Sequence, residues 1–407
     1  MKRHLITTLP ALAVLALACG CASKPRSQQV RADASQRVND VNANVIYEQA
    51  RQSFEGGHLD KALREINSAL AINPENSDYL TLQGRIHMES RRLEQAVTSF
   101  QAAQQHDPKN HEAFYFSGVI YQRWSDDEQA YENYRRAFEI KSDNVNYLLA
   151  AAESLVALGE FQTAKQLIDP KVKFFEHNVA LKQLQAQIAM LLDNPAEAAT
   201  YYAEARLLEP DDAMLIEDLA WAQFKSGQYT QCVDTLRSLR QKTGQGRLDL
   251  LQLEAQCLAM LDRPAESRDV YIQLSNLQPG NVDVWIELGT VCWELQDYRR
   301  LQECGSRVVN IAPNRYEGYL LKGVYEKNMG DRSEAIRQLR QAASRAKDTA
   351  LPHTLLGLIL EDTGFMDEAL GAYRQALTIE PNNTDARRFF NNLQETMRIT
   401  SVPTDGK

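Results

Sequence analysis

Residues 74–108 read PENSDYLTLQGRIHMESRRLEQAVTSFQAAQQHDP, and this stretch decides the fold. Pro74 and Pro108 bound it, and the small residues Gly84 and Ala96 lie between them. Two antiparallel helices can approach closely only where their side chains are small, so the stretch predicts a helical hairpin with its contact at Gly84 and Ala96. Pro108 is expected to end the second helix, because proline cannot continue the backbone hydrogen bonds.

The same pattern recurs along the chain every 34 residues, with one residue inserted near Gly244–Gly246. The copies end at Pro74, Pro108, Ser142, Glu176, Pro210, Gly244, Pro279, Pro313, Lys347 and Pro381. The position 24 residues before each end is always glycine or alanine: Ala50, Gly84, Gly118, Ala152, Ala186, Ala220, Ala255, Gly289, Gly323 and Gly357. The position twelve residues before the end is small in every copy except the one with Leu301: Ala62, Ala96, Ala130, Ala164, Ala198, Cys232, Ser267, Ala335 and Ala369.

This period, with its paired small residues and terminal prolines, resembles the tetratricopeptide repeat. The resemblance implies an all-α fold, a right-handed superhelical solenoid of ten helix-turn-helix copies over residues 43–383, whose first helices line a concave face. We expect a capping helix over residues 384–398, as the end of a solenoid requires, and a disordered tail over residues 399–407. Lys171 and Leu301 depart from the pattern, so their copies are expected to be locally irregular.

Residues 1–20 have the features of a signal peptide. Lys2 and Arg3 give the segment a positive start, and the apolar run from Leu5 to Ala18 is too short to span a bilayer. With the small residues and cysteines that follow, the segment resembles a bacterial lipoprotein signal. The polar residues 21–42 are expected to form a flexible tether between the lipid and the folded part.

The lipoprotein resemblance implies that one cysteine carries the lipid. Cys21 follows Gly20 and is the expected attachment site, and Cys19 is the alternative, because neither has the usual Leu three residues earlier. Secretion without lipidation, after cleavage near Ala18, also stays open. A lipidated chain without Asp after the cysteine is expected, by the same resemblance, at the outer membrane facing the periplasm.

Composition and motifs argue against catalysis and against nucleic acid as a partner. The formal net charge is −9, whereas nucleic-acid binding needs a basic surface. His111 and Glu112 begin a sequence like the zinc-protease motif HExxH, but Tyr115 stands where the second histidine is needed. We therefore expect no enzymatic activity, no catalytic residues, no metal and no cofactor.

Four further cysteines follow in the repeats: Cys232, Cys257, Cys292 and Cys304. They form no CxxC pair, Cys232 occupies a small-residue position, and buried free cysteines behave as small hydrophobic residues. An oxidising periplasm permits disulfides. However, these positions differ in height along the hairpins, so the pattern favours unpaired thiols and leaves pairing open.

Protein partners are expected to bind along the first helices of the copies. By the resemblance, three positions beside the packing stripe of each first helix face the concave groove. The candidate partner-binding residues at these positions are Tyr47, Arg51, Phe54, Arg85, Tyr115, Glu217, Trp221, Phe224, Ile286 and Trp293. Aromatic and arginine side chains are frequent anchors of bound peptides and helices, and Glu217 would favour a basic residue in the partner. For Trp221 and Trp293, burial between neighbouring helices is an equal alternative.

These observations favour a non-catalytic scaffold lipoprotein that binds other proteins in its groove. The expected role is the assembly of an envelope machine for secretion, pilus formation or polysaccharide export. An adaptor that presents substrates to a periplasmic peptidase or a cell-wall enzyme is the alternative. The identity of the partner and the oligomeric state do not follow from the sequence.

Overall fold

The computed structural model describes residues 26–243 and 247–400, and over these ranges every regular element is a helix. The all-α class of helix-turn-helix copies expected from the repeats is therefore confirmed. The expected signal peptide, both candidate lipid-attachment cysteines and residues 401–407 of the expected tail lie outside the described residues. None of the described helices combines the length and the apolar character needed to cross a membrane.

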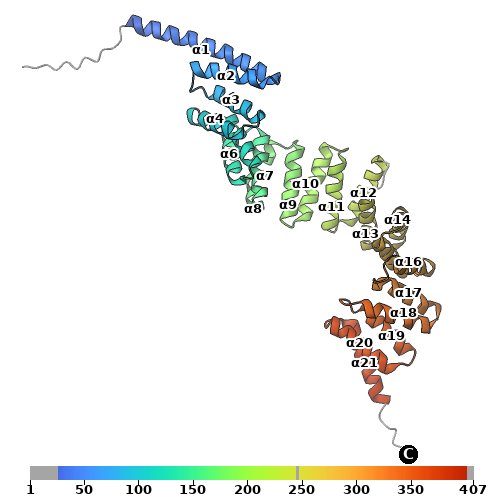
Figure 1. The fold of residues 1–407 in the computed structure, drawn as a ribbon. Coiled ribbons are helices and arrows are strands. Elements are labelled where there is room, and N and C mark those ends of the chain that lie inside the picture. Colours follow the sequence, from blue (N-terminus) through green and yellow to red (C-terminus); the bar gives the residue numbers. More distant parts are fainter. Residues whose placement is uncertain (1–25, 244–246, 401–407) are drawn as a thin grey trace, which may run out of the picture. The chain divides into compact units, whose positions relative to one another are not determined.

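The chain divides into two compact units, residues 1–160 and 161–407. In the described part of the first unit, three antiparallel helix pairs are followed by one further helix (Figure 1). These helices are α1 (Arg26–Glu55), α2 (Leu59–Ile72), α3 (Ser77–Glu89), α4 (Leu93–His106), α5 (His111–Arg123), α6 (Asp127–Ile140) and α7 (Val145–Ala157).

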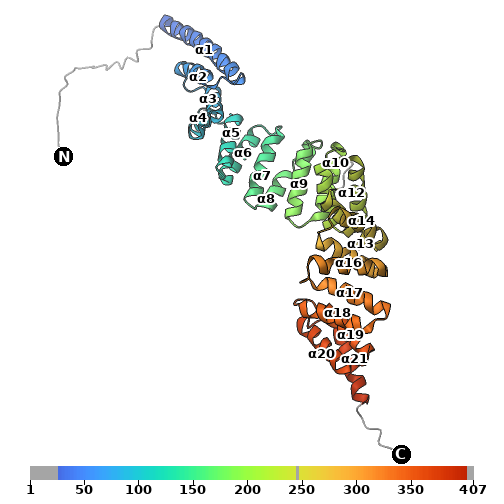
Figure 2. The ribbon, with the colours of Figure 1, turned by 45° about the vertical axis from the view of Figure 1, so that its right-hand side comes forward.

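The second unit begins with the short helix α8 (Phe161–Ile168) and the 3-10 turn η1 (Val172–Phe174). Six antiparallel pairs and a last helix follow within its described residues (Figure 2). They are α9 (Val179–Leu191), α10 (Pro195–Leu208), α11 (Ala213–Lys225), α12 (Tyr229–Thr243), α13 (Leu248–Met260), α14 (Pro264–Leu277), α15 (Val282–Glu294), α16 (Tyr298–Ile311), α17 (Tyr316–Met329), α18 (Arg332–Arg345), α19 (Leu351–Asp362), α20 (Met366–Ile379) and α21 (Thr384–Thr400). The last of these lies where the capping helix was expected.

A bulky side chain of the second helix packs against a small residue of the first helix in several hairpins. A Cβ atom added to Gly118 would lie 2.7 Å from the ring of Tyr134, and one added to Gly84 would lie 2.5 Å from the ring of Phe100. Both rings are buried. The Tyr134 hydroxyl keeps a partner by donating to Gln122 Oε1 at 2.9 Å. The small residues of the sequence pattern therefore set the distance between the two helices of a hairpin.

A residue in the left-handed backbone conformation follows the first helix in each described copy. Five of these residues are glycines, which adopt the conformation without strain: Gly57, Gly159, Gly227, Gly330 and Gly364. The others carry side chains: Arg91, Ser125, Asp193, Asp262 and Gln296. Such a backbone is unfavourable by about 1–2 kcal/mol for most residues, so the packing of the two helices imposes the turn where glycine is absent.

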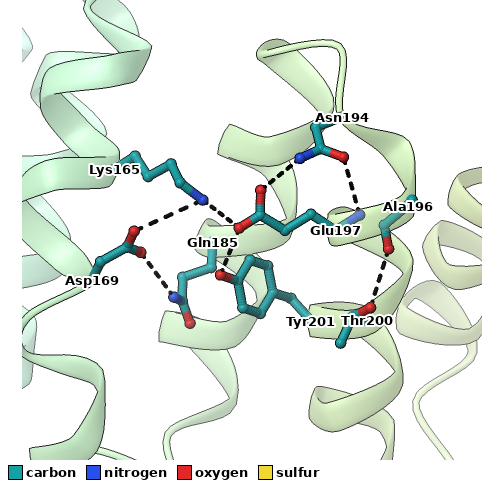
Figure 3. A network of polar contacts seen from close by, with 8 residues as sticks. All are labelled: Lys165, Asp169, Gln185, Asn194, Ala196, Glu197, Thr200 and Tyr201. Atoms are coloured by element: carbon teal, nitrogen blue, oxygen red, sulfur yellow. Dashed lines mark hydrogen bonds and ion pairs between the residues drawn. The ribbon is translucent and has the colours of Figure 1, made fainter.

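The fourth copy is irregular, as its departures from the pattern predicted. Helix α8 has only 8 residues, and Pro170 follows it. Polar contacts link α8 to α10 instead: the Lys165 ammonium pairs with Glu197, which also accepts a hydrogen bond from the Tyr201 hydroxyl at 2.9 Å (Figure 3). The hydrogen bond from Lys165 lowers the pKa of Glu197 below its ordinary value. These contacts hold α8 in place where the hairpin lacks a full second helix.

The eighth copy is regular despite its departures, because Leu301 is fully buried within the unbroken helix α16. The inserted residue near Gly244 also leaves α12 and α13 packed together. Glu254 of α13 is 2% exposed and accepts hydrogen bonds from Arg237 and Arg240 of α12, each at 2.7 Å. Removing one member of such a buried ion pair is strongly destabilising, so this cluster fixes the pairing of the two helices across the insertion.

The structure corrects the expected start of the folded part. Residues 26–42, part of the expected flexible tether, belong to α1. No glycine or proline interrupts the sequence from Arg26 to Glu55, so nothing in it ends the helix earlier. Packing nevertheless begins near the expected boundary, because Ala43 is fully buried while Val38 and Val41 are exposed.

The two glycines of the last hairpin test the packing rule, which is that a small residue of the first helix sets the distance between the two helices of a hairpin. A Cβ atom at Gly357 of α19 would lie 2.6 Å from Cδ1 of Tyr373, so Gly357→Ala should overpack the hairpin and destabilise it by about 1–3 kcal/mol. A Cβ atom at Gly371 of α20 meets nothing within 4 Å, so Gly371→Ala should stabilise the helix by about 0.5–1 kcal/mol. Chemical denaturation followed by circular dichroism measures both, and hydrogen exchange should rise first in residues 351–379 for Gly357→Ala. Equal effects of the two substitutions would contradict the packing rule.

Candidate partner-binding surface

The first helices of the first unit carry a layer of tyrosine side chains. Tyr47 of α1 stacks on Tyr79 of α3 with ring centroids 4.9 Å apart. Tyr115 of α5 lies at the same centroid distance, 4.9 Å, from Tyr147 of α7. Tyr79 and Tyr147 are buried, whereas Tyr47 and Tyr115 are half-buried. The two predicted residues therefore lie on a buried aromatic layer and present part of each ring to solvent.

Arg85 connects three neighbouring first helices. Its guanidinium carbon lies 5.1 Å from the ring centroid of Phe54 on α1 and 5.0 Å from that of Phe116 on α5. A planar guanidinium that stacks on aromatic faces keeps its N–H donors at its edge. Arg85 has no ion-pair partner within the described ranges, whereas Arg51 already pairs with Glu48 at 2.6 Å. Of the two predicted arginines, Arg85 is therefore the one with unpaired donors for a ligand.

In the second unit, Trp221 and Phe224 lie on α11 with their rings edge to face, 6.2 Å apart. Trp221 is 40% exposed, while Phe224 packs against the hydrophobic core of the unit. Glu217, expected to receive a basic partner residue, accepts hydrogen bonds from Arg247 at 2.6 and 2.7 Å. Glu217 thus already has a counter-charge within the chain, with which a basic partner residue would have to compete, and its expected role stays a prediction.

Trp293 borders a hollow between the ends of α15 and α17. The hollow has a volume of about 470 Å³ and is lined by Thr290, Trp293, Glu294, Gln296, Tyr298 and Asn328. The Tyr298 hydroxyl donates to Asn328 Oδ1 at 3.1 Å, which fixes one wall. Trp293 and the neighbouring Ile286 are half-buried against the core. Trp293 therefore combines both alternatives of the sequence analysis, since part of it packs and part lines the hollow.

Two carboxylates lie beside the predicted groove residues of the second unit. Asp218 follows Glu217 on α11, and Glu287 follows Ile286 at the same repeat position of α15. Desolvation raises the pKa of both groups, and nearby Asp283 adds to the effect at Glu287. Glu287 keeps part of its surface exposed to solvent although the surrounding protein raises its pKa. Neither carboxylate has an ion-pair partner in the described part of the chain.

The sequence analysis missed several residues that complete this surface. Phe116, Tyr79 and Tyr147 were assigned no role, although they hold the predicted Arg85, Tyr47 and Tyr115 in place. Tyr79 and Tyr147 share one repeat position, and this recurrence was the available signal. Among the described residues, no three His, Cys, Asp or Glu side chains are arranged to hold a metal ion.

The pattern of the tetratricopeptide repeat family matches residues 47–111, 81–144 and 320–384. These segments coincide with α1–α6 and with α17–α20, where the small-residue contacts recur. Residues 47–144 and 320–384 are tetratricopeptide repeats. Repeats of this family are protein-interaction modules, and the aromatic surface of the first unit lies within the matched residues 47–144, except for Tyr147.

A curated relative shares the repeat with this chain at low sequence identity. A tetratricopeptide repeat-containing protein, trd-1, of Caenorhabditis elegans is 23% identical over 130 residues, which are 31% of this chain. The match spans only 17% of that curated relative's length.

Solved structures also resemble this chain. A Naa15/Naa10 complex bound to HypK matches with a TM-score of 0.48 at 13% identity over 90% of this chain and 69% of that chain. A tetratricopeptide repeat protein of Parabacteroides merdae matches with a TM-score of 0.42 at 16% identity over 61% of this chain and 98% of that chain.

The Arg85 contacts can be tested within the first repeats. Arg85→Gln should lower the free energy of unfolding by about 1–2 kcal/mol, because it removes two cation–π contacts of about 0.5–1 kcal/mol each. Arg85→Lys should recover only part of the loss, since lysine keeps the charge but not the planar stacking. Urea denaturation measures the effect, and Arg64→Gln on the exposed side of α2 is the matched control, with a change below about 0.5 kcal/mol. Equal losses at both arginines would show that the stacked arrangement contributes nothing.

Proposed function

We propose that this chain is a non-catalytic scaffold lipoprotein that binds protein partners along its first helices. Its role would be to assemble an envelope machine, such as one for secretion, pilus formation or polysaccharide export. The single observation that carries the proposal is the pairing of partly exposed aromatic side chains with desolvated, unpaired carboxylates on the same helices. The exposed aromatic surface and the unpaired carboxylates each lower the stability of an isolated chain. A bound partner would cover the aromatic surface and supply a counter-charge to the carboxylates.

The carboxylates favour a partner segment that contains basic residues. The folded protein disfavours the charged forms of Asp218 and Glu287, because partial desolvation and neighbouring carboxylates raise the pKa of both and neither is paired. A lysine or arginine of a partner would supply the missing counter-charge. Trp221 and Trp293 lie on the same helices as these carboxylates, at α11 and α15. We therefore infer an extended or helical segment in which apolar anchors alternate with basic residues.

The proposed envelope location follows from the first 21 residues. A signal peptide would export the chain, and acyl chains on Cys21 would hold it at the outer membrane, facing the periplasm. Several acyl chains bind a membrane firmly, whereas one chain binds only weakly. The net charge of −9 gives the protein no electrostatic attraction to anionic lipid, so the lipid would supply the attachment.

Neutralising the two carboxylates should weaken partner binding without lowering the stability of the fold. Asp218→Asn and Glu287→Gln should leave the free energy of unfolding at pH 7 unchanged or raise it by up to about 1 kcal/mol, because they remove disfavoured charges. Wild-type stability should rise as the pH falls through these raised pKa values, and the double variant should lack this component. In the same double variant, the affinity for the native partner should fall about three-fold or more at low salt, and less at high salt.

The matched control is Glu303→Gln, an exposed carboxylate on the second helix α16. It should alter neither partner affinity nor the pH dependence of stability. Partners cross-linked in intact cells and purified with the chain provide the affinity measurement. If Glu303→Gln weakened capture as much as the double variant, binding along the first helices would be contradicted.

The anchor is tested by fractionation of cells. Cys21→Ser should move the protein from the membrane to the soluble periplasmic fraction, because the thioether link to the lipid can no longer form. Cys19→Ser is the matched control and should leave the protein on the membrane. The opposite pattern would identify Cys19 as the attachment site, and membrane association of both variants would contradict a lipid anchor.

A further inference from the structure

A hollow with mostly basic walls lies beside the short turns of the first two hairpins. It has a volume of about 780 Å³ and lies where α2 begins and where a turn joins α3 to α4. The charged and polar side chains that line it are His58, Asp60, Lys61, Arg64, Ser90 and Arg92. Three cations and one carboxylate therefore meet here, in a chain whose formal net charge is −9.

The cations of this hollow lack good counter-ions. Neither Arg64 nor Arg92 has an ion-pair partner in the described part of the chain. The Lys61 ammonium lies 3.6 Å from the Glu65 carboxylate, which already accepts a hydrogen bond from the Ser53 hydroxyl at 2.6 Å. Because like charges repel one another, this cluster is more favourable when an anion lies among its members.

The charge of Lys61 is unusual for its place in the repeat. Lys61 directly precedes the small residue of the second helix, and four other copies have a glutamate there: Glu197, Glu266, Glu334 and Glu368. The dipole of a helix stabilises an acid in its first turn and disfavours a cation. The eighth copy also has a cation at this position, Arg300, but its guanidinium lies 3.3 Å from the Asp297 carboxylate. Lys61 is therefore the cation at this position that most needs an external anion.

The ninth copy shows what the first copy has lost. Arg337 stands at the repeat position of Arg64, and it donates a hydrogen bond to Glu334 at 2.7 Å. Glu334 stands at the position of Lys61. The ninth copy thus holds an internal ion pair at two positions where the first copy holds two cations.

The starts of α2 and α4 add backbone donors to the hollow. Asp126, Asp297 and Asp331 cap the equivalent helices of other copies by accepting a hydrogen bond from a first-turn N–H group. The equivalent residues His58 and Arg92 form no such hydrogen bond. Uncapped N–H groups at a helix start are donors for an anion, and here they supplement side chains that supply the positive charge.

We propose that this hollow binds a phosphate group carried by a small ligand or a lipid. The planar guanidinium group matches the geometry of phosphate oxygens and binds them through paired hydrogen bonds. A phosphate also has enough oxygens and charge to accept from cations of both hairpins at once. The volume lies within the range of about 300–1,000 Å³ that is typical of small-ligand sites, so a diphosphate or a larger phosphate compound would fit. The site is separate from the proposed partner surface on the first helices.

Titration of the full chain with inorganic pyrophosphate in low-salt buffer, followed by calorimetry, tests the site. Lys61→Glu should lower the affinity about ten-fold or more, because it gives Arg64 the partner that Arg337 has in the ninth copy. The melting temperature of this variant should stay the same or rise, since glutamate at this position suits the helix start. Arg92→Gln should weaken binding as well.

The matched control is Arg299→Glu, which makes the same change of charge at an exposed arginine of α16. It should leave the affinity for pyrophosphate unchanged. Equal affinities of the wild type and Lys61→Glu would overturn the proposal, and so would equal losses in Lys61→Glu and Arg299→Glu, which would mean that only the net charge matters.

Vesicles separate the two sources of phosphate. Wild type and Lys61→Glu are sedimented with vesicles of phosphatidylcholine alone and with vesicles that also contain phosphatidate. A lipid anchor would hold both proteins equally, so a gain with phosphatidate in the wild type alone identifies a lipid headgroup as the ligand. Equal sedimentation of both proteins, with pyrophosphate binding intact in the wild type, identifies a soluble phosphate compound. Binding of neither pyrophosphate nor phosphatidate would overturn the proposal.

Discussion

The contact between a bulky side chain on one helix and a glycine or alanine on its neighbour is the constraint on which this fold depends. Within hairpins, Gly84 lies under Phe100 and Gly357 under Tyr373. Between hairpins, Gly289 approaches Leu321 of the next copy, with 2.5 Å to an added Cβ atom. The adjoining stripe of the first helices is buried in some copies, as at Thr81 and Leu320, and partly exposed in others, as at Tyr115 and Trp221. The candidate partner surface therefore lies directly beside the small-residue contacts that hold the helices together.

The sequence was sufficient to predict the helical hairpins because small residues at fixed spacing leave few ways to pack two helices. The sequence was less informative where an interaction other than the small-residue contact determines the local structure. The left-handed turns at Arg91 and Gln296 contain no glycine that would predict them. The helical residues 26–42 pack against little else, so their sequence shows no pattern of buried apolar residues. The side-chain pairs of the surface depend on contacts between copies, so Phe116 and the Glu217–Arg247 pair could not be recognised from one copy alone.

The second unit contains both a strongly stabilised region and unpaired carboxylates. Glu254 is buried and pairs with both Arg237 and Arg240, so this region has more than hairpin packing to hold it together. Asp218 and Glu287, in contrast, are desolvated without partners on the helices that carry Trp221 and Trp293. A rigid frame that presents unsatisfied groups is what a pre-organised binding surface requires, because little further ordering is needed when the partner arrives.

Site-specific photo-crosslinking in intact cells tests most directly whether partners bind along the first helices. A photoreactive amino acid at Thr290 would lie in the hollow beside Trp293, and one at Leu207, which is 83% exposed, would lie on the second helix α10. The account predicts crosslinks from position 290 to one defined protein, mapped to a segment with basic and apolar residues, and none to that segment from position 207. Crosslinks to the same segment from position 207 alone would contradict it.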